Sequence, residues 1–495
     1  MNRYEKITKT DTDLIPKDGS LTGSYLCTWW MQSPAATALG LSGEGLSEWR
    51  DALCTEGLFS REDLFHPMER ENRSGIIFLL DDGWDLPKSG GTPISNDHYG
   101  AVDPDPEKFK EFGNTPTERL SAMNRAVRDM GYAGLGLWIS PQKCKTGPDA
   151  TLSDREYWEK RAGWCHEAGI LYWKVDWGEQ DFDDDYRALI SDCARRLAPG
   201  MLVEHAVVQK PCTHHHGDDF PAHREARARR QMSFADVYRT YDVLEPFDKV
   251  CTLMRAHEAL LAGADERGTG RGLINGENIY GIVSALGLTA GIMNYTTEAR
   301  ACVRWQRLAP PFGIYEADYH YSDEQLCDFL FFASEICGWA PCKGRTVREY
   351  APAVMSRGCP LPVVSPTGEH APFVVASKNP KTRAFSVATV TRSIDPVREA
   401  YFPADVTVTD ACIDAPVGVF GVFNSLTVEF DSPIPEGARV LTQDLCDSFA
   451  YDATALVTIE GNRITLDGKD LRYLSKVSRG HNDRSEPSLI IKISY

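Results

Sequence analysis

Short apolar runs alternate with amphipathic stretches along the chain from about residue 21 to about residue 345. Eight of the runs have the length and composition of β-strands. They cover residues 24–30, 76–80, 134–139, 171–175, 201–206, 237–241, 272–275 and 291–295. Between several of them lie amphipathic stretches at residues 116–130, 155–168 and 183–197, which their periodicity predicts to be helices.

The spacing between the runs predicts how the strands are connected. Trp29 and Asn294 mark the first and last runs, and the seven intervals between them span 265 residues. Each unit therefore has about 38 residues, enough for a strand, a loop, a helix and a return to a parallel neighbour. Eight such units favour a closed barrel over an open sheet, so we predict a (β/α)8 TIM barrel over residues 21–350.

The pattern changes after residue 345. Short runs rich in β-branched residues follow one another, separated by the Gly, Pro, Asn and Asp residues that are typical of turns. The runs cover residues 373–377, 384–391, 406–409, 417–423, 426–430, 455–459, 463–466 and 489–493. We predict that residues 351–495 form a C-terminal antiparallel β-sandwich and that residues 1–20 are an N-terminal extension.

Composition and charge narrow the class of protein. The 495 residues are 42% hydrophobic and 25% charged, as in globular proteins, and the net charge of −18 disfavours binding to nucleic acid or to an anionic membrane. No run approaches 18 apolar residues, and the N-terminus lacks the features of a signal peptide. The 14 cysteines show no CxxC pairs. We therefore expect a cytosolic protein with reduced, mostly buried thiols.

Catalytic residues of such a barrel lie at the C-terminal ends of its strands, because the loops that follow the strands meet around one mouth. The second run ends in Asp81 and Asp82, followed by Gly83 and Trp84. These carboxylates can accept hydrogen bonds from sugar hydroxyls, and the tryptophan can cover the apolar face of a sugar ring. An Asp-Gly turn with helix-capping acids is the alternative for this motif taken alone.

The fourth run ends in a lysine and a carboxylate two residues apart, Lys174 and Asp176. Because the side chains of a strand alternate in direction, both project to the same side at the barrel mouth. A nearby ammonium lowers the pKa of a carboxyl, which keeps a nucleophile ionised at neutral pH. Asp176 is therefore a candidate nucleophile, with a structural ion pair as the alternative.

The fifth and sixth runs add further candidates. The sixth contains Arg239, whose guanidinium can donate two hydrogen bonds to neighbouring hydroxyls. Asp242 and Glu245 follow it, and either can serve as a proton donor, with ordinary helix N-capping as the alternative for Asp242. The fifth run holds Glu204, a candidate for contact with a sugar hydroxyl, and His205, for which a satisfied buried imidazole is favoured.

Three consecutive histidines, His214, His215 and His216, raise the question of metal binding. Consecutive residues of a regular strand or helix cannot all face one ion, and metal sites usually draw their ligands from spaced positions. A solvated loop is therefore favoured, and we predict neither a metal nor a cofactor.

The order of the motifs resembles that of a known group of enzymes. The sequences LDDGW, GLGLW, YWKVDWG and VYRTYDV begin at residues 80, 134, 172 and 237. This series resembles the clan of retaining α-glycosidases that contains the α-galactosidases and the raffinose-synthase-like proteins, glycoside hydrolase families 27 and 36. The resemblance spans most of the first 300 residues, and it implies a TIM barrel that is commonly followed by a C-terminal β-sandwich.

The resemblance also implies a role for each of these residues. The paired aspartates of the second strand would grip galactose hydroxyls beside the lysine of the fourth. The aspartate of the fourth strand would be the nucleophile, and the arginine and aspartate of the sixth would be sugar ligand and acid/base. These roles fall on Asp81, Asp82, Lys174, Asp176, Arg239 and Asp242.

Three features depart from the pattern of the family. Asp242 lies three residues after Arg239, whereas most α-galactosidases have a spacing of four, and the spacing here is closer to the RxSDD form of raffinose-synthase-like sequences. Glu204 and His205 stand where many α-galactosidases have a cysteine-containing motif, and the aromatic segment at residues 28–30 only approximates the family's signature. The acid/base therefore stays open between Asp242 and Glu245, and the sugar stays open.

Together these features predict a retaining exo-α-glycosidase, α-galactosidase-like, that acts on terminal α-linked galactose-type sugars of an oligosaccharide or glycoside by double displacement. The alternatives are a glycosyl-transferring enzyme of the same clan, a barrel metallohydrolase that uses the histidines with Asp176, and a catalytically silent sugar-binding protein. The sequence leaves open the linkage and whether the chain forms a homo-oligomer. The predicted sugar contacts, besides the paired aspartates, are Trp29, Trp30, Trp84, Trp138, Lys174, Glu204, His205 and Arg239.

Overall fold

The computed structural model of the chain describes most of its length. The described residues are 3–41, 45–87, 98–206, 220–240, 248–265, 267–323, 325–327, 331–332, 346–347, 350–368, 371–391, 402–477, 479 and 483–495.

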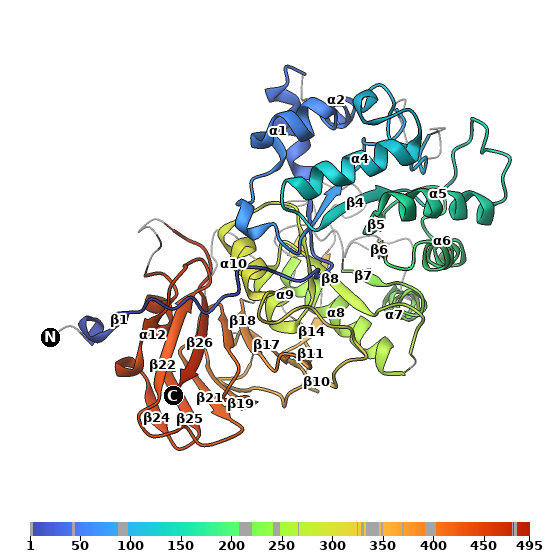
Figure 1. Cartoon of the computed structure of the whole chain (residues 1–495). Coiled ribbons are helices and arrows are strands. Elements are labelled where there is room, and N and C mark those ends of the chain that lie inside the picture. The colour runs from blue at the N-terminus through green and yellow to red at the C-terminus, as the bar shows by residue number, and fades with distance from the viewer. Residues whose placement is uncertain are drawn as a thin grey trace.

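Eight parallel strands close into a barrel in the order in which they occur along the chain (Figure 1). The strands are β2 (Tyr25–Cys27), β3 (Ile77–Leu80), β4 (Gly134–Ile139), β5 (Tyr172–Val175), β6 (Leu202–Ala206), β7 (Val237–Arg239), β8 (Leu273–Glu277) and β9 (Thr289–Ile292). The last strand, β9, pairs with the first, β2, and so closes the ring. The predicted (β/α)8 barrel and its eight strands are confirmed.

Helices follow the strands, as the alternating pattern predicts. The helix α4 begins after a capping box of Thr115 and Glu118, and α5 begins after a second one, formed by Ser153 and Glu156. In both, a hydroxyl accepts a backbone N–H that would otherwise lack a partner, which fixes where the helix starts. The helices that follow the strands β3 to β9 are α4 (Pro116–Asp129), α5 (Asp154–Ala168), α6 (Asp184–Leu197), α7 (Phe220–Met232), α8 (Asp248–Asp265), α9 (Tyr280–Leu286) and α10 (Thr297–Trp305).

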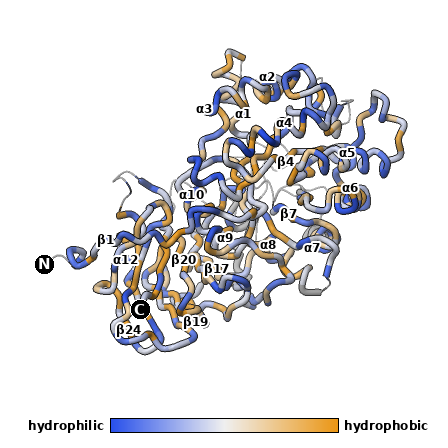
Figure 2. The backbone as a smooth tube through the Cα atoms, in the orientation of Figure 1, coloured by the Kyte–Doolittle hydropathy of each residue, from blue (hydrophilic) through white to orange (hydrophobic). Residues whose placement is uncertain are grey.

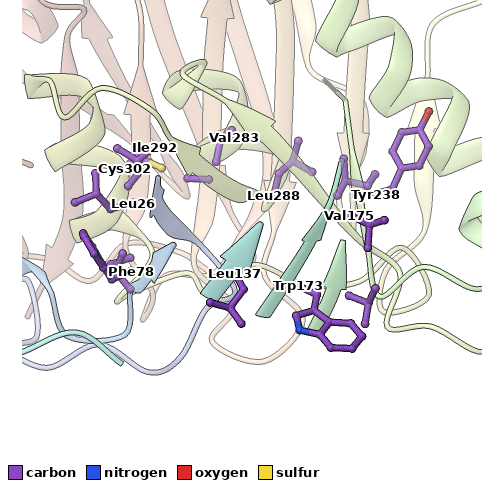
Figure 3. Close-up of a cluster of buried hydrophobic side chains, with 14 of the residues drawn as sticks. Leu26, Phe78, Leu137, Trp173, Val175, Tyr238, Val283, Leu288, Ile292 and Cys302 are labelled. Carbon is purple, nitrogen blue, oxygen red and sulfur yellow. The ribbon is translucent and has the colours of Figure 1, made fainter. Parts of the chain in front are cut away.

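The largest apolar core lies between the barrel strands and their surrounding helices. Figure 3 shows part of it, with Leu26, Phe78 and Leu137 on the strands, Val283 on α9 and Cys302 on α10. All of these side chains are fully buried. Burial of this kind stabilises the fold by roughly 25 cal/mol for each Å² of apolar surface removed from water, and it holds the strand ends in place.

The connection between β2 and β3 carries three short helices, α1 (Trp29–Ala38), α2 (Leu46–Asp51) and α3 (Glu62–Phe65). Figure 1 shows them together on one side of the barrel, in blue. They bring Arg50 of α2 to the carboxyl end of β3, where it meets Asp82. This connection therefore contributes to the barrel mouth.

The C-terminal region forms two stacked sheets, which confirms the predicted β-sandwich. Their interface buries residues from both sheets, such as Val374, Val387, Leu426 and Ile491. Most strand pairs are antiparallel, while β15–β17, β18–β20 and β19–β21 are parallel. The nine-stranded sheet has the order β1 (Thr8–Lys9), β23 (Tyr451–Asp452), β22 (Arg439–Asp444), β26 (Ser488–Ser494), β20 (Val417–Phe420), β18 (Phe385–Val390), β17 (Phe373–Lys378), β15 (Val354–Arg357) and β10 (Tyr319–Tyr321). The five-stranded sheet has the order β16 (Val363–Ser365), β19 (Asp405–Ala411), β21 (Ser425–Phe430), β25 (Arg463–Asp467) and β24 (Thr458–Glu460).

Two segments outside residues 351–495 belong to this sandwich. The strand β1 pairs with β23, and the backbone N–H of Leu14 donates to Gln443, so the N-terminal extension runs along the C-terminal sheet (Figure 1). The strand β10 pairs with β15, so the chain enters the C-terminal sheet at Tyr319, before residue 351. Both contacts join residues far apart in the sequence, which local patterning does not predict.

The sandwich packs against the α9 side of the barrel. The Arg357 guanidinium donates to the backbone carbonyls of Leu286 and Phe312, at 2.6 and 3.0 Å, and the Trp305 ring makes an edge contact with Phe420. Hydrophobic segments follow the strands of the sandwich and the centre of the barrel, whereas outer helices such as α7 are largely hydrophilic (Figure 2). The C-terminal domain is therefore fixed against α9 and the end of α10.

The structure also bears on the predicted state of the cysteines and on membrane spans. The cysteines whose side chains the structure describes carry free thiols, and most of them are buried, as predicted. None of the described helices combines the length and hydropathy that a membrane span needs.

Candidate active site

The carboxylate of Asp176 lies directly after β5, at the mouth of the barrel. Each of its oxygens accepts one hydrogen bond: Oδ1 from Arg239 Nη2 at 2.8 Å and Oδ2 from the indole N–H of Trp138 at 2.8 Å. Its side chain is 11% exposed, so the carboxylate is held rigidly yet still reaches the surface of the mouth.

The charges around Asp176 favour its ionised form. Burial acts to raise the pKa of this carboxyl. The guanidinium of Arg239 and the ammonium of Lys174 outweigh burial, so the pKa lies below its ordinary value. The predicted effect of Lys174 is therefore present, and Arg239 is the larger cause. Asp176 is a carboxylate at neutral pH, as a nucleophile must be.

Lys174 forms its own ion pair with Asp81 across the barrel mouth. The distance from Lys174 Nζ to Asp81 Oδ2 is 2.8 Å, and the thiol of Cys27 donates to the same oxygen at 3.0 Å. Burial acts to lower the pKa of Lys174, but the charge of Asp81 outweighs it and raises the pKa above the ordinary value. The two groups together offer a cation and a carboxylate, a pair that can bind neighbouring sugar hydroxyls.

Asp82 is held by a different cation from its neighbour. Arg50 donates to Asp82 Oδ2 from Nε at 3.0 Å and from Nη2 at 2.7 Å. The glycine that follows makes this contact feasible: Gly83 has φ +121°, and a Cβ there would lie 2.6 Å from the Cα of Arg50. The turn after β3 therefore needs glycine for both its conformation and its close approach to α2.

Arg239 lies at the centre of three carboxylates inside the barrel. Besides Asp176, it contacts Glu277 at 3.0 Å and Glu204 at 3.6 Å, and its side chain has no exposed surface. Glu204 also accepts hydrogen bonds from Tyr172 at 2.8 Å and from Tyr25 at 3.3 Å. The guanidinium is thus fixed from several sides, and it orients Asp176.

The carboxyl of Glu204 differs from that of Asp176 in its charge state. Burial raises the pKa of Glu204 to about 7, although Arg239 and Lys174 oppose the shift. This group sits deep in the barrel, with no exposed surface, among hydroxyl donors. It therefore exchanges a proton near neutral pH, whereas Asp176 stays ionised there.

The four predicted tryptophans occupy different environments. Trp138 is almost fully buried, and its N–H contacts Asp176. Trp84 is fully buried, and its N–H donates to the backbone carbonyl of Trp138 at 3.0 Å, so it packs behind Trp138. Trp29 is half-buried against Trp49, and Trp30 is 50% exposed.

His205 does not join the other predicted residues at the mouth. Its ring lies against α6, with Nε2 2.8 Å from the Ser191 hydroxyl and Nδ1 3.4 Å from Arg187. Burial holds its pKa well below the ordinary range, so it is a neutral imidazole. This is the satisfied buried histidine that the sequence favours, and it is far from the arrangement a metallohydrolase needs with Asp176.

Several predicted residues lie outside the described part of the chain. They are Asp242, Glu245, His214, His215 and His216. The choice of acid/base and the role of the three histidines stay predictions. Within the described residues, no group of three or more His, Cys, Asp or Glu side chains could hold a metal ion.

Sequence reasoning missed five residues of this site. Glu277 is the last residue of β8 and lies two positions beyond the predicted run. A carboxylate at the end of a barrel strand was the sequence signal that could have identified it. Arg50, Cys27, Tyr25 and Tyr172 gave no such signal, because their neighbours come from other segments. Gly291 leaves the space that the Glu277 side chain occupies, because a Cβ at position 291 would lie only 2.8 Å from Glu277 Cγ.

Comparisons with known proteins return solved structures, while no family model and no curated protein matches the chain. The α-galactosidase of Saccharomyces cerevisiae in complex with raffinose is 8% identical, and the match covers 89% of this chain and 84% of that one with a TM-score of 0.32. A family 27 β-L-arabinopyranosidase of Geobacillus stearothermophilus is 8% identical over 97% of this chain and 96% of that one, with a TM-score of 0.34. An Anoxybacillus α-amylase is 8% identical over 89% and 91%, with a TM-score of 0.41.

These similar structures include α-galactosidases, the group that the sequence motifs resemble. With TM-scores below 0.5 the likenesses carry no part of the functional argument. The residues at the barrel mouth carry the functional assignment.

Proposed function

We propose that the chain is a retaining exo-α-glycosidase, α-galactosidase-like, that removes a terminal α-linked sugar from an oligosaccharide or glycoside. One observation carries the proposal. Asp176 stands at the end of β5 with one donor fixed on each oxygen, and neighbouring cations hold its pKa below the ordinary value. A positioned, ionised carboxylate that reaches a barrel mouth has the properties of a glycosidase nucleophile.

The chemistry takes two steps. Asp176 attacks the anomeric carbon, the C–O bond to the leaving group breaks, and a protonated acid delivers its proton to the departing oxygen. Water then attacks the same carbon and loses its proton to the residue that acted as the acid. The bond between this carbon and the Asp176 carboxylate breaks, and the sugar is released. The sequence assigns this acid/base to Asp242, with Glu245 as the alternative.

Sugar recognition in this proposal falls on the two aspartates after β3. Asp81 is paired with Lys174 and Asp82 with Arg50, so each site offers acceptors and donors together. Such charged pairs hold vicinal hydroxyls by several hydrogen bonds at once. A galactose-type sugar, a cytosolic location and a reaction without a cofactor stay predictions from the sequence.

The test replaces the nucleophile by Asp176→Ala, with the exposed Asp185→Ala as the matched control. The Asp176 variant should fold and lose turnover of nitrophenyl α-galactoside, and added azide should restore part of it by attacking the anomeric carbon in the vacated space. The azide product should be a β-glycosyl azide, and the control should behave as the wild type. Activity of Asp176→Ala close to that of the wild type would refute the assignment, and sugar binding by a wild type without turnover would indicate a sugar-binding protein.

A further inference from the structure

A cavity of about 330 Å³ lies where the barrel mouth meets the C-terminal domain. Its volume is within the range of roughly 300–1,000 Å³ that is typical of small-molecule sites. The barrel contributes residues that follow three of its strands: Trp30 after β2, Asn278 after β8, and Asn294 after β9. The C-terminal domain contributes Thr389, Val390, Arg484 and Glu486.

Two residues that line the cavity lie close in the chain to residues of the candidate active site. Asn278 directly follows Glu277, whose carboxylate binds the same Arg239 that holds Asp176. Trp30 lies two residues beyond Thr28, whose hydroxyl accepts the backbone N–H of Asp81 at 2.9 Å. The segments that carry Glu277 and Thr28 therefore continue into the wall of the cavity.

The position of the cavity in the ring of strands fits the geometry of the reaction. It spans the ends of β8, β9 and β2, which are neighbours in the barrel, with β9 in the middle. Asp176 follows β5, four strands away from β9 in a ring of eight, so the two lie across the mouth from each other. In a displacement at the anomeric carbon the leaving group departs on the side opposite the nucleophile. The cavity is on that side.

The chemistry of the cavity favours a neutral polyhydroxyl ligand. Trp30 offers a half-exposed indole, the kind of surface on which a sugar ring packs. Two cations and two carboxylates line the walls in balance, and one of each forms the Lys249–Glu486 pair at 3.2 Å. An anion-binding site would show an excess of cations, so mixed charges with amides and hydroxyls suit a saccharide.

We propose that this cavity is the subsite for the leaving-group saccharide, and that the C-terminal domain thereby takes part in substrate selection. The proposal rests on the proposed glycosidase function. It assigns Trp30 as the platform for the second sugar ring and Arg484 as a hydroxyl donor from the C-terminal domain.

The test compares two substrates that differ in the leaving group. The leaving group of raffinose is a disaccharide, which would occupy the cavity. The leaving group of α-galactosyl fluoride is a single atom, which is too small to contact the cavity walls. We expect Trp30→Ala and Arg484→Ala each to lower the ratio of kcat/KM for raffinose to kcat/KM for the fluoride by about tenfold. The control is Tyr495→Ala, an exposed aromatic residue one position beyond the end of β26 that is remote from Glu486, and it should leave the ratio unchanged.

The outcomes separate the two proposals. A wild type that hydrolyses neither substrate contradicts the proposed α-galactosidase activity. A wild type that hydrolyses the fluoride, with both variants keeping the wild-type ratio, overturns the subsite and leaves the glycosidase proposal intact. A fall of the ratio in Trp30→Ala alone overturns the role of the C-terminal domain.

Discussion

Removing the guanidinium of Arg239 should disturb both the stability and the pH dependence of the protein. This side chain has no exposed surface, and it contacts Asp176 at 2.8 Å, Glu277 at 3.0 Å and Glu204 at 3.6 Å. In Arg239→Met the carboxylates lose their shared cation, while most of the volume of the side chain is kept. The variant therefore reports on charge more than on packing.

The magnitude follows from the burial of the cluster. Breaking a buried ion pair by removing one partner costs about 3–5 kcal/mol, because the remaining charge stays buried without compensation. We expect a loss of that size in the free energy of unfolding at pH 7.5. Arg239 is the strongest influence that lowers the pKa of Asp176, so its removal raises that pKa. The acidic limb of kcat/KM should consequently move to higher pH.

The assay combines urea unfolding, followed by tryptophan fluorescence, with pH profiles of kcat/KM. The matched control is Arg357→Met, which removes another fully buried arginine whose partners are backbone carbonyls near the C-terminal domain. It should destabilise the protein and leave the acidic limb in place. The double variant Arg239→Met/Glu277→Gln should be less destabilised than the sum of the single variants, by about 0.5–3 kcal/mol, because one uncompensated charge is removed. Additive effects, or an unmoved acidic limb in Arg239→Met, would show that Arg239 does not hold these carboxylates ionised.

Two further predictions concern the other carboxyls. If Asp242 is the general acid, Asp242→Asn should slow substrates with poor leaving groups far more than activated aryl glycosides, since only the former need protonation; the same pattern in Glu245→Gln instead would move the assignment to Glu245. The raised pKa of Glu204, about 7 against 4.5, means that its stabilising effect is fully present below pH 4.5 and is lost as pH rises through 7. Glu204→Gln mimics the protonated form of the side chain. In urea unfolding the variant should be about as stable as the wild type at pH 4.5 and about 3 kcal/mol more stable at pH 8. If variant and wild type were equally stable at both pH values, the raised pKa of Glu204 would be contradicted.

The barrel was predictable because its signals are local. Each strand is a short apolar run, and capping residues such as Thr115 and Ser153 mark where helices begin. The strand ends then directed attention to Asp81, Lys174 and Asp176, since parallel strands of a barrel all point their carboxyl ends to one mouth.

The partners of these residues were not predictable, because they are set by long-range packing. Nothing near Arg50 in the sequence indicates that α2 carries it to Asp82, and Gly83 reveals the contact only when the close approach of the two backbones is known. The tryptophan of the DDGW motif was expected to cover a sugar face, yet the same turn directs Trp84 into the core behind Trp138. The N-terminal strand β1 likewise finds its partner β23 at the other end of the chain.

The stereochemistry of the reaction shows whether Asp176 is the nucleophile of a double displacement. Proton NMR of an α-galactoside digest identifies the anomer that is released first, before mutarotation mixes the two forms. We predict the α-anomer, because two inversions at the anomeric carbon, one by Asp176 and one by water, give net retention. A β-anomer that appears first would show a single displacement by water and would contradict the assignment of Asp176 as the nucleophile.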